Sequence, residues 1–317
     1  MMQLGEPELV ARLKASRSVL IAGAGGGFDL YAGLPLYFLL RGLGKEVHLA
    51  NLSFTHLARV RGEEVDQHVV RIGADTEGPG HYFPERALAR WLRARGTPAP
   101  IYCLHKVGCR PLRQAYRALR SALDLDTVVL VDGGTDILMR GDECDLGTPQ
   151  EDLTSVAAVS DLEVRQKLVV CLGFGIDRHH GVCHAHFLEN VAALSREGAF
   201  LGAMSLLKEM PEVSAYLEAV AFSSEQMPEA PSIVSSSIAS AIEGEYGDAH
   251  RISRTRGSRL WINPLMGLYW AFELEAVARR CLYLRSLADT ETAGEVHAII
   301  EAFRETVALR PRLDIPV

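Results

Sequence analysis

Residues 18–29 read SVLIAGAGGGFD, an apolar run of strand length followed at once by a glycine-rich turn and an aspartate. A continuous apolar run of this length is typical of a strand buried on both faces of a parallel sheet. The pattern returns at 127–136, TVVLVDGGTD, and at 167–177, KLVVCLGFGID. Amphipathic stretches separate the runs, which indicates βαβ units. We therefore predict an α/β fold, a doubly wound, mainly parallel Rossmann-like sheet with helices on both faces.

The remaining elements follow from the same periodicities. Further strands are expected at 46–51, 101–105 and 200–206, and a hairpin or edge strand within 59–82. Helices are expected at 84–95, 111–123, 185–196, 232–243, 265–287 and 290–308, and another begins at Pro149 with Thr148 as its N-cap. No linker or repeat interrupts the pattern. Residues 1–317 are therefore expected to form one α/β domain, with the C-terminal helices of about 265–308 packing on the sheet.

Composition limits the partners and the compartment. The formal net charge is −7 and the arginines are scattered, so nothing attracts the chain to nucleic acid. No stretch reaches the roughly 18 apolar residues that cross a bilayer, and the amphipathic start of the chain lacks an apolar signal core. The six cysteines form no CxxC pair. We expect a cytoplasmic protein that binds a small molecule, and its oligomeric state stays open between monomer and homo-oligomer.

Glycine and aspartate gather in the loops that follow three of the predicted strands. Ligands of open parallel sheets bind outside the carboxyl ends of the strands, where glycine lets the backbone approach them. Asn51, at the end of another strand, offers further hydrogen bonds. The predicted substrate-binding residues are Gly25, Gly26, Asp29, Asn51, Gly133, Gly134 and Thr135. The alternative interpretation is that these glycines only form tight strand-to-helix turns and bind no ligand.

These loops do not match the common phosphate-binding motifs. Gly23, Gly25 and Gly27 have the wrong spacing for G-x-G-x-x-G, and the second strand ends in Asn51 where an acidic residue would hold a ribose. No Gly-Lys-Ser/Thr follows any glycine loop. The carboxylates would repel a bare phosphate and suit a metal ion, a hydroxyl-rich substrate or proton transfer at a raised pKa. The predicted catalytic residues are Asp136, Asp177 and Asp132.

Four of the 11 histidines fall within residues 179–186, where a predicted strand meets its helix. Imidazoles and a carboxylate are common ligands of zinc and non-haem iron. The predicted metal ligands are His180, His184, His186 and Glu189. His184 and His186 share a face only if the segment is extended, because on a helix the pairs are His180 with His184 and His186 with Glu189. A metal-free catalytic histidine and a purely structural role remain alternatives.

Three segments resemble those of a known family. They are GAGGGFD (23–29), GKEVHLANLSF (44–54) and DGGTDILMRGDECDLGTPQEDLTSVAAV (132–159). The chain is similar, from about residue 18 to its C-terminal helices, to an uncharacterised prokaryotic family of about 300 residues, a domain of unknown function. The resemblance implies an α/β sandwich. It implies no activity and no catalytic residue.

Three functions compete on these residues. The first is a metal-dependent oxygenase or hydrolase that acts on a small polar substrate, such as a nucleoside or sugar, with Fe(II) as the favoured ion and Zn or Mn as alternatives. The second is a nucleotide- or phosphate-handling enzyme that is metal-free or uses Mg²⁺ bridging the aspartates. The third is a non-catalytic ligand sensor.

Overall fold

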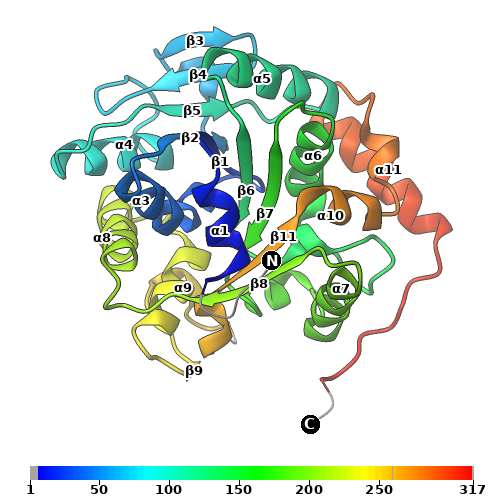
Figure 1. Cartoon of the computed structure of the whole chain (residues 1–317). Helices are drawn as coiled ribbons and strands as arrows, with labels where there is room; N and C mark the ends of the chain where they lie inside the picture. The colour runs from blue at the N-terminus through cyan, green and yellow to red at the C-terminus, as the bar shows by residue number, and fades with distance from the viewer. Residues whose placement is uncertain (1–5, 259, 316–317) are drawn as a thin grey trace.

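A computed structural model describes residues 6–258 and 260–315 of the chain. Within this part, nine strands form one sheet in the order β3-β4-β5-β2-β1-β6-β7-β11-β8 (Figure 1). Their bounds are β1 Ser18–Gly23, β2 Glu46–Leu52, β3 Glu63–Asp66, β4 Val69–Ile72, β5 Ile101–Leu104, β6 Thr127–Asp132, β7 Gln166–Cys171, β8 Phe200–Ser205 and β11 Leu268–Glu273. Two short strands, β9 Gly247–Asp248 and β10 Trp261–Ile262, pair with each other away from this sheet.

The five central strands, β5, β2, β1, β6 and β7, run parallel to one another. The flanking strands are antiparallel: β4 to β5, β3 to β4, β11 to β7 and β8 to β11. In the parallel part, Gly23 is level with Asn51 on one side and with Val131 on the other. The carboxyl ends of these strands therefore form one edge. The prediction of a mainly parallel, Rossmann-like sheet is confirmed.

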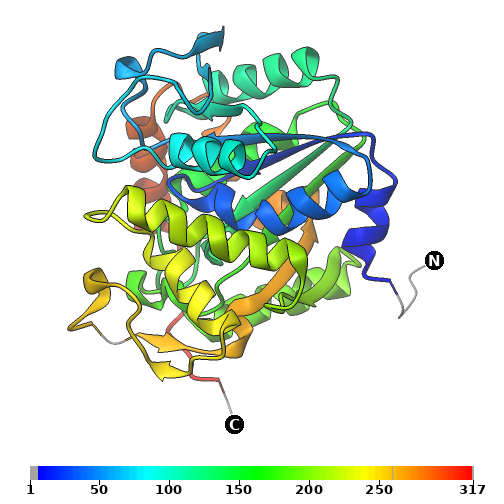
Figure 2. The ribbon, with the colours of Figure 1, turned by 90° about the vertical axis from the view of Figure 1, so that its left-hand side faces the viewer.

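Helices cover both faces of the sheet (Figures 1 and 2). One face carries α1 Glu8–Lys14, α2 Asp29–Ala32, α3 Leu34–Gly42, α4 Pro84–Ala94, α8 Pro211–Gln226 and α9 Ile233–Ile242. The other carries α5 Cys109–Ala122, α6 Pro149–Ser160, α7 His184–Arg196, α10 Leu274–Arg280 and α11 Ala293–Thr306. Figure 2 shows α4, α3 and α8 side by side on the first face.

Side chains of the apolar strands pack into two hydrophobic cores, one on each face of the sheet. In β1, Leu20 and Ala22 pack into the core under α5 and α6, while Val19 and Ile21 pack into the core under α3 and α8. Alternate residues of a strand point to opposite faces, so a strand covered on both sides is apolar at every position. Every residue of β1 and of β6 is buried. This explains why the strand positions were predictable.

Residues 265–273 correct one prediction. They were expected to begin a long helix, but Pro264–Gly267 forms a 3-10 turn and Leu268–Glu273 is the strand β11. Tyr269, Trp270 and Phe272 favour strand conformation, and β11 gains hydrogen bonds from β7 and β8 on both sides. Only Leu274–Arg280 of the expected helix is α-helical before a further 3-10 turn. The C-terminal part thus extends the sheet as well as covering it.

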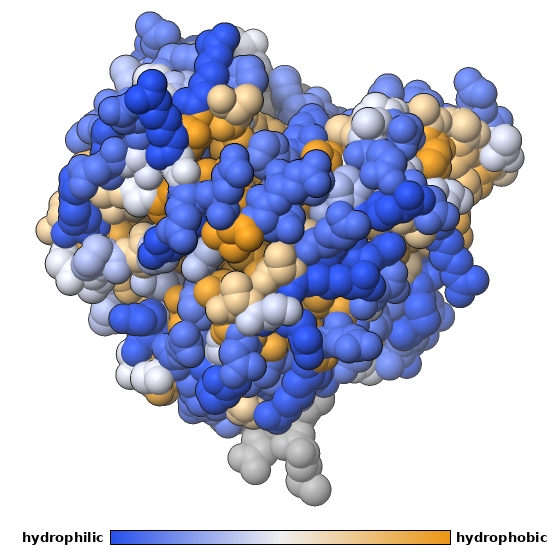
Figure 3. All heavy atoms as spheres, turned by 90° about the horizontal axis from the view of Figure 1, so that it is seen from above, coloured by the Kyte–Doolittle hydropathy of each residue, from blue (hydrophilic) through white to orange (hydrophobic). Residues whose placement is uncertain are grey.

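The surface of the described residues is mainly polar. Seen from the side of β3 and β4, hydrophilic side chains cover most of the face and apolar ones appear in separate patches (Figure 3). The β3–β4 hairpin at this edge confirms the expected hairpin within 59–82. Among the described residues, none of the helices combines the length and the apolar character that a bilayer span requires.

Candidate functional site

The strand order defines where a ligand is expected. Counted along the chain, the parallel strands lie in the order 3-2-1-4-5, so the direction of winding reverses between β1 and β6. In open α/β sheets, ligands bind in the crevice outside the carboxyl ends of the strands at this reversal. The loop after β1 and the loop after β6 border that crevice. Both are the glycine- and aspartate-rich loops of the sequence.

Five aspartates gather at this edge, and we call them the carboxylate cluster: Asp29, Asp132, Asp136, Asp152 and Asp177. They come from different elements: the start of α2, the end of β6, the turn after β6, the first turn of α6 and the turn after β7. Asp29, Asp132 and Asp152 each place one carboxylate oxygen within 4.8 Å of the other two. Asp29 is half-buried, and the other four are 2–6% exposed.

Backbone amides of the glycine loops hold two members of the cluster. Asp29 accepts hydrogen bonds from the amides of Gly25, at 2.7 Å, and Gly133, at 3.2 Å. Asp132 accepts from Gly134 at 2.6 Å and from Ile137 at 3.3 Å. The two loops are therefore tied together through Asp29. The amides of Gly133 and Gly134, two of the predicted substrate-binding residues, donate to these carboxylates.

Asp136 and Asp177 are held in the same way. Asp136 accepts from the amide of Thr148 at 2.7 Å and from its hydroxyl at 3.1 Å, which joins the β6 loop to the start of α6. The expected N-cap Thr148 thus donates its hydroxyl to Asp136 and makes no side-chain cap. Asp177 accepts from the amide and hydroxyl of Thr135 at 2.6 and 3.2 Å. Thr135, another predicted substrate contact, is buried against Asp177.

Asp152 differs from the other four. Its side chain is buried, and its Oδ1 atom has no hydrogen-bond partner. A buried, unpaired polar oxygen costs free energy, so such a group calls for an explanation. Both oxygens of Asp152 face Gly25: a Cβ added to Gly25 would lie 2.6 and 2.8 Å from them. Glycine at position 25 is therefore required for the approach of a carboxylate.

The pKa values of all five aspartates are raised, and burial is the main cause. For Asp132, Asp152 and Asp177 the neighbouring carboxylates add to the rise. The pKa of Asp29 reaches about 7, although the amides of Gly133 and Gly25 oppose the shift. Like charges in a shared, water-poor site cannot all ionise. Full ionisation of the cluster is therefore unfavourable without a counter-charge.

Asn51 lies behind the first glycine loop. It is fully buried, and its Nδ2 atom donates to the carbonyl of Gly27 at 2.9 Å and to Glu85 at 2.8 Å. Gly26 is covered by the ring of Phe54, because a Cβ on Gly26 would lie 2.6 Å from that ring. Asn51 therefore supports the shape of the loop. Among the predicted substrate contacts, Gly25 and Asp29 remain the partly exposed ones.

The structure does not bring the four predicted metal ligands of the histidine segment together. Among the described residues, Asp29, Asp132 and Asp152 are the one set of three acidic, histidine or cysteine side chains whose ligand atoms lie this close. His180 is exposed, and Glu189 pairs with Arg310. His186 is buried, with its Nδ1 atom 4.0 Å from Cys144 Sγ.

Helix phase explains this separation. His184 is the first residue of α7, so His184 and His186 lie two positions apart on a helix and point in different directions. His184 packs on Phe174, with ring centroids 5.1 Å apart, and its Nε2 atom has no partner. His180 belongs to the 3-10 turn Ile176–His180 before the helix. The extended conformation that would align His184 with His186 is absent from this segment.

A cavity adjoins the carboxylate cluster on the β7 side. It has a volume of about 680 Å³, and Asp177, Arg178 and Trp261 contribute to its wall. Ligand sites typically measure about 300–1,000 Å³. Asp177 is shared by the cavity and the cluster. A molecule in the cavity would therefore lie next to the carboxylates.

Glu143, in the acidic loop after β6, supports the loop instead of facing the crevice. Its side chain is 0% exposed and accepts from the amides of Arg140 and Gly141 and from Asn190 Nδ2, at 2.8–3.1 Å. Arg310 lies 3.3 Å away. The carboxylate of Glu143 thus has hydrogen-bond and ion-pair partners within the protein, unlike Oδ1 of Asp152.

We expect Glu143→Gln to lower the free energy of unfolding by about 1–2 kcal/mol, since it weakens several charge-assisted hydrogen bonds. Urea unfolding measures this change. If the carboxylate cluster binds a cation, the folded variant should bind it as the unchanged chain does. A Glu143→Gln protein that is fully stable but binds no cation would show that Glu143 serves the site and not the loop.

No role was predicted for Asp152, although it stands in the LGTPQED segment. One signal could have found it. Helix α6 is buried on nearly all sides, so a charged residue in its first turn must face either a partner or a site. The amino end of α6 follows the β6 loop, so Asp152 could be expected to face the candidate site at that edge of the sheet.

The sequence matches one family model over residues 20–306, and this model is described as "Protein of unknown function (DUF1152)". The chain belongs to this family. The predicted resemblance is thereby confirmed over nearly the whole chain. Comparison with curated proteins finds no match, and comparison with solved structures finds none either. Membership in DUF1152 brings no activity, so function must be argued from the carboxylate cluster and its surroundings.

Proposed function

We propose that the chain is a divalent-cation-dependent hydrolase that acts on a small polar substrate, with the cation held by Asp29, Asp132 and Asp152. The observation that carries the proposal is the approach of these three carboxylates to within 4.8 Å, with a buried, unpartnered oxygen on Asp152. Three carboxylates that lack counter-charge are unfavourable in a buried site unless a cation joins them.

The chemistry of the ligands favours a hard cation. Carboxylate oxygens suit Mg²⁺ and Mn²⁺, whereas non-haem iron sites use two histidines and a carboxylate, and zinc sites are built mainly on histidine and cysteine. Mn²⁺, one of the ions expected from the sequence, and Mg²⁺ therefore replace Fe(II) as first choice. Without the two-histidine set, water activation is better supported than oxygen chemistry, so hydrolysis is preferred to an oxygenase reaction.

Asp177 is the best-placed residue for proton transfer. It lines the cavity beside the cluster, and one of its oxygens is fixed by Thr135 while the other is left for a proton. Its pKa is raised by burial and by Asp136, so Asp177 holds a proton more readily than an ordinary aspartate does. The cation would polarise the substrate or its attacking water, and Asp177 would accept or return the proton.

Mn²⁺ titration followed by electron paramagnetic resonance tests the assignment of the site. We expect one strong site in the chelator-treated full chain, its loss in Asp132→Asn, and its retention in the double variant His184→Ala/His186→Ala. If the histidine variant loses Mn²⁺ binding while Asp132→Asn retains it, the metal site lies in the histidine segment and the proposed ligands are wrong.

Turnover is the second measurement. The Mn²⁺-loaded chain should release nitrophenol from at least one of a panel of nitrophenyl phosphates, esters and glycosides, and EDTA should stop the release. If the chain binds Mn²⁺ strongly but turns over no member of the panel, the hydrolase assignment is wrong and only the cation site stands.

A further inference from the structure

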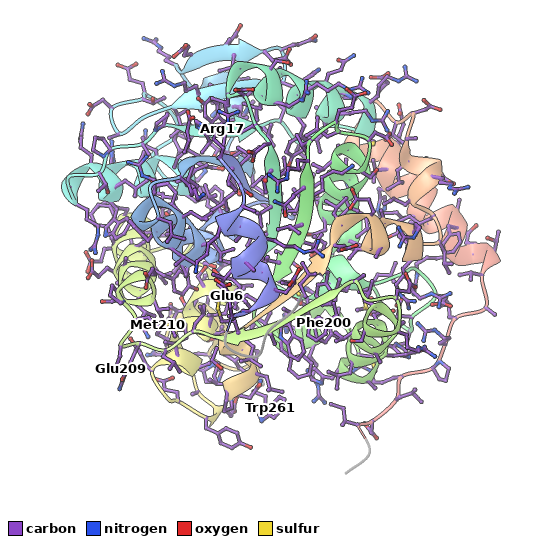
Figure 4. All side chains as sticks on the ribbon, in the orientation of Figure 1. Glu6, Arg17, Phe200, Glu209, Met210 and Trp261 are labelled. Carbon is purple, nitrogen blue, oxygen red and sulfur yellow. The ribbon has the colours of Figure 1, made fainter. Side chains whose placement is uncertain are left out.

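Residues from two parts of the chain line the cavity beside Asp177. The first is the turn after β7, with Asp177, Arg178 and two histidines. The second comes from the start of α9 and the segment that leads into β10, with Ile233, Val234 and Trp261. Trp261 lies in the lower part of the molecule, far from the β3–β4 hairpin (Figure 4). The cavity is therefore lined both by Asp177 of the carboxylate cluster and by this aromatic side chain.

The charged side chains that line the cavity are mainly basic, although the chain as a whole is acidic. Arg178 and Arg254 line it, and Asp177 is the one carboxylate among the described lining residues. Arg178 is exposed. Arg254 donates from one nitrogen to the carbonyl of Pro231 at 2.6 Å, which leaves other guanidinium donors free. Arginines beside a cation site are the usual recognition elements for phosphate oxygens.

The second part of the lining suits a flat ring. The side chain of Trp261 is 40% exposed although it is large and apolar. It is held on one side by His184, with ring centroids 5.9 Å apart and the planes nearly perpendicular. Ile233 and Val234 add apolar surface nearby. A fixed, partly exposed tryptophan is a stacking surface for a nucleobase.

We infer that this cavity binds a nucleoside phosphate, with the base on Trp261 and the phosphates between the arginines and the cation. This inference rests on the proposed function for the position of the phosphates, because the cation neutralises charge that the carboxylates would otherwise repel. Asp177 places the phosphates next to the carboxylate cluster, and Trp261 offers the surface for the base. A nucleoside phosphate also gives the hydrolase a substrate class, since the bond to be cleaved lies at the phosphate end.

Calorimetric titration of the full chain with α,β-methylene analogues of ADP, GDP, CDP and UDP tests the inference, because these resist cleavage. Adenosine and methylenediphosphonate serve as base-only and phosphate-only probes. With Mn²⁺ present, we expect at least one nucleotide analogue to bind at least about tenfold more tightly than either part, since one base stack is worth about 1–3 kcal/mol.

The variants separate the two parts of the lining. Arg178→Gln should weaken the nucleotide analogue and methylenediphosphonate alike, while Trp261→Leu should weaken the nucleotide analogue only. Arg256→Gln, an exposed arginine of the same segment outside the cavity, is the matched control and should change neither. Equal affinity for methylenediphosphonate and every nucleotide analogue would overturn the assignment of a base site, as would a Trp261→Leu variant that binds normally.

The failure of each proposal has its own signature. If Mn²⁺ binds at the aspartates but no nucleotide analogue binds, the nucleotide inference is wrong and the cation site stands. If a nucleotide analogue binds in EDTA and depends on Arg178 and Trp261, while Asp132→Asn leaves Mn²⁺ binding unchanged, the cavity assignment stands and the proposed cation site fails.

Discussion

Replacing Asp152 by asparagine is expected to stabilise the cation-free protein and to abolish its strong Mn²⁺ binding. The side chain of Asp152 is buried, and its Oδ1 atom lacks a hydrogen-bond partner. Its pKa is raised by burial first and then by Asp132, Asp136 and Asp29. Removing its charge relieves this repulsion, as is common at functional sites that trade stability for activity.

The gain at pH 8 should be on the order of 1–3 kcal/mol, the usual cost of a buried polar group that lacks a partner. The loss of a direct ligand should cost at least about 100-fold in Mn²⁺ affinity, since even the loss of a residue that supports a ligand costs 10–100-fold. Urea unfolding in EDTA and Mn²⁺ titration measure the two effects on the same protein.

Asp161→Asn is the matched control, because Asp161 follows the other end of α6, is exposed and pairs with Arg113. It should change neither the stability in EDTA by more than about 0.5 kcal/mol nor the Mn²⁺ affinity. If Asp152→Asn instead destabilises the cation-free protein and still binds Mn²⁺, then Asp152 is a structural residue and the cation site is wrongly placed.

The second large effect concerns pH. Without a cation, the protein should lose stability as the pH rises from about 4 through 7, and Mn²⁺ should remove this loss. A carboxyl group whose pKa is raised on folding holds its proton more tightly in the native state. Between the unfolded and folded pKa values the native state therefore binds more protons, and the free energy of unfolding falls as the pH increases.

For Asp29 this window runs from 3.8 to about 7. Each pKa unit corresponds to about 1.4 kcal/mol, so Asp29 alone would account for a loss of roughly 4 kcal/mol. Asp132, Asp152 and Asp177 shift in the same direction and add to the loss. A bound cation favours the ionised carboxylates, so its uptake releases protons and its affinity rises with pH.

Urea unfolding at pH 4.5, 6.0 and 7.5, in EDTA and in Mn²⁺, gives the required comparison. The two series should meet at pH 4.5 and diverge steadily above it. In EDTA the Asp152→Asn variant should show a shallower decline than the unchanged chain. A cation-free protein that becomes more stable between pH 4.5 and 7.5 would mean that the aspartates ionise without a counter-charge.

Much of the fold could be predicted because its strands are fully buried. The run 127–132 is apolar up to its last residue, Asp132, and both its ends coincide with those of β6. Parallel strands bring their carboxyl ends to one edge, so Asp29, Asp132, Asp136 and Asp177 could be expected to approach one another. The structure places them together. Their chemical roles stay predictions until the cation is measured.

Other features depend on contacts that a local pattern does not contain. The run 268–273 resembles a buried helix by its apolar content, and only its pairing with β7 and β8 makes it a strand. Asp152 reaches the site because the first turn of α6 packs next to Gly25 in the loop after β1. The histidine segment has the right residue types for a metal, but its helix phase separates His184 from His186.

Because β11 lies between β7 and β8, this side of the sheet cannot be completed before β11 has been synthesised. β8 ends at Ser205, and its sheet partner in the described structure begins at Leu268. During synthesis, β8 must therefore wait for some sixty further residues before it can pair, with β7 left as an open edge meanwhile. Such long-range pairing is slow. The nascent chain thus passes through a stage in which an unpaired, apolar strand edge is exposed to chaperones or to other nascent chains.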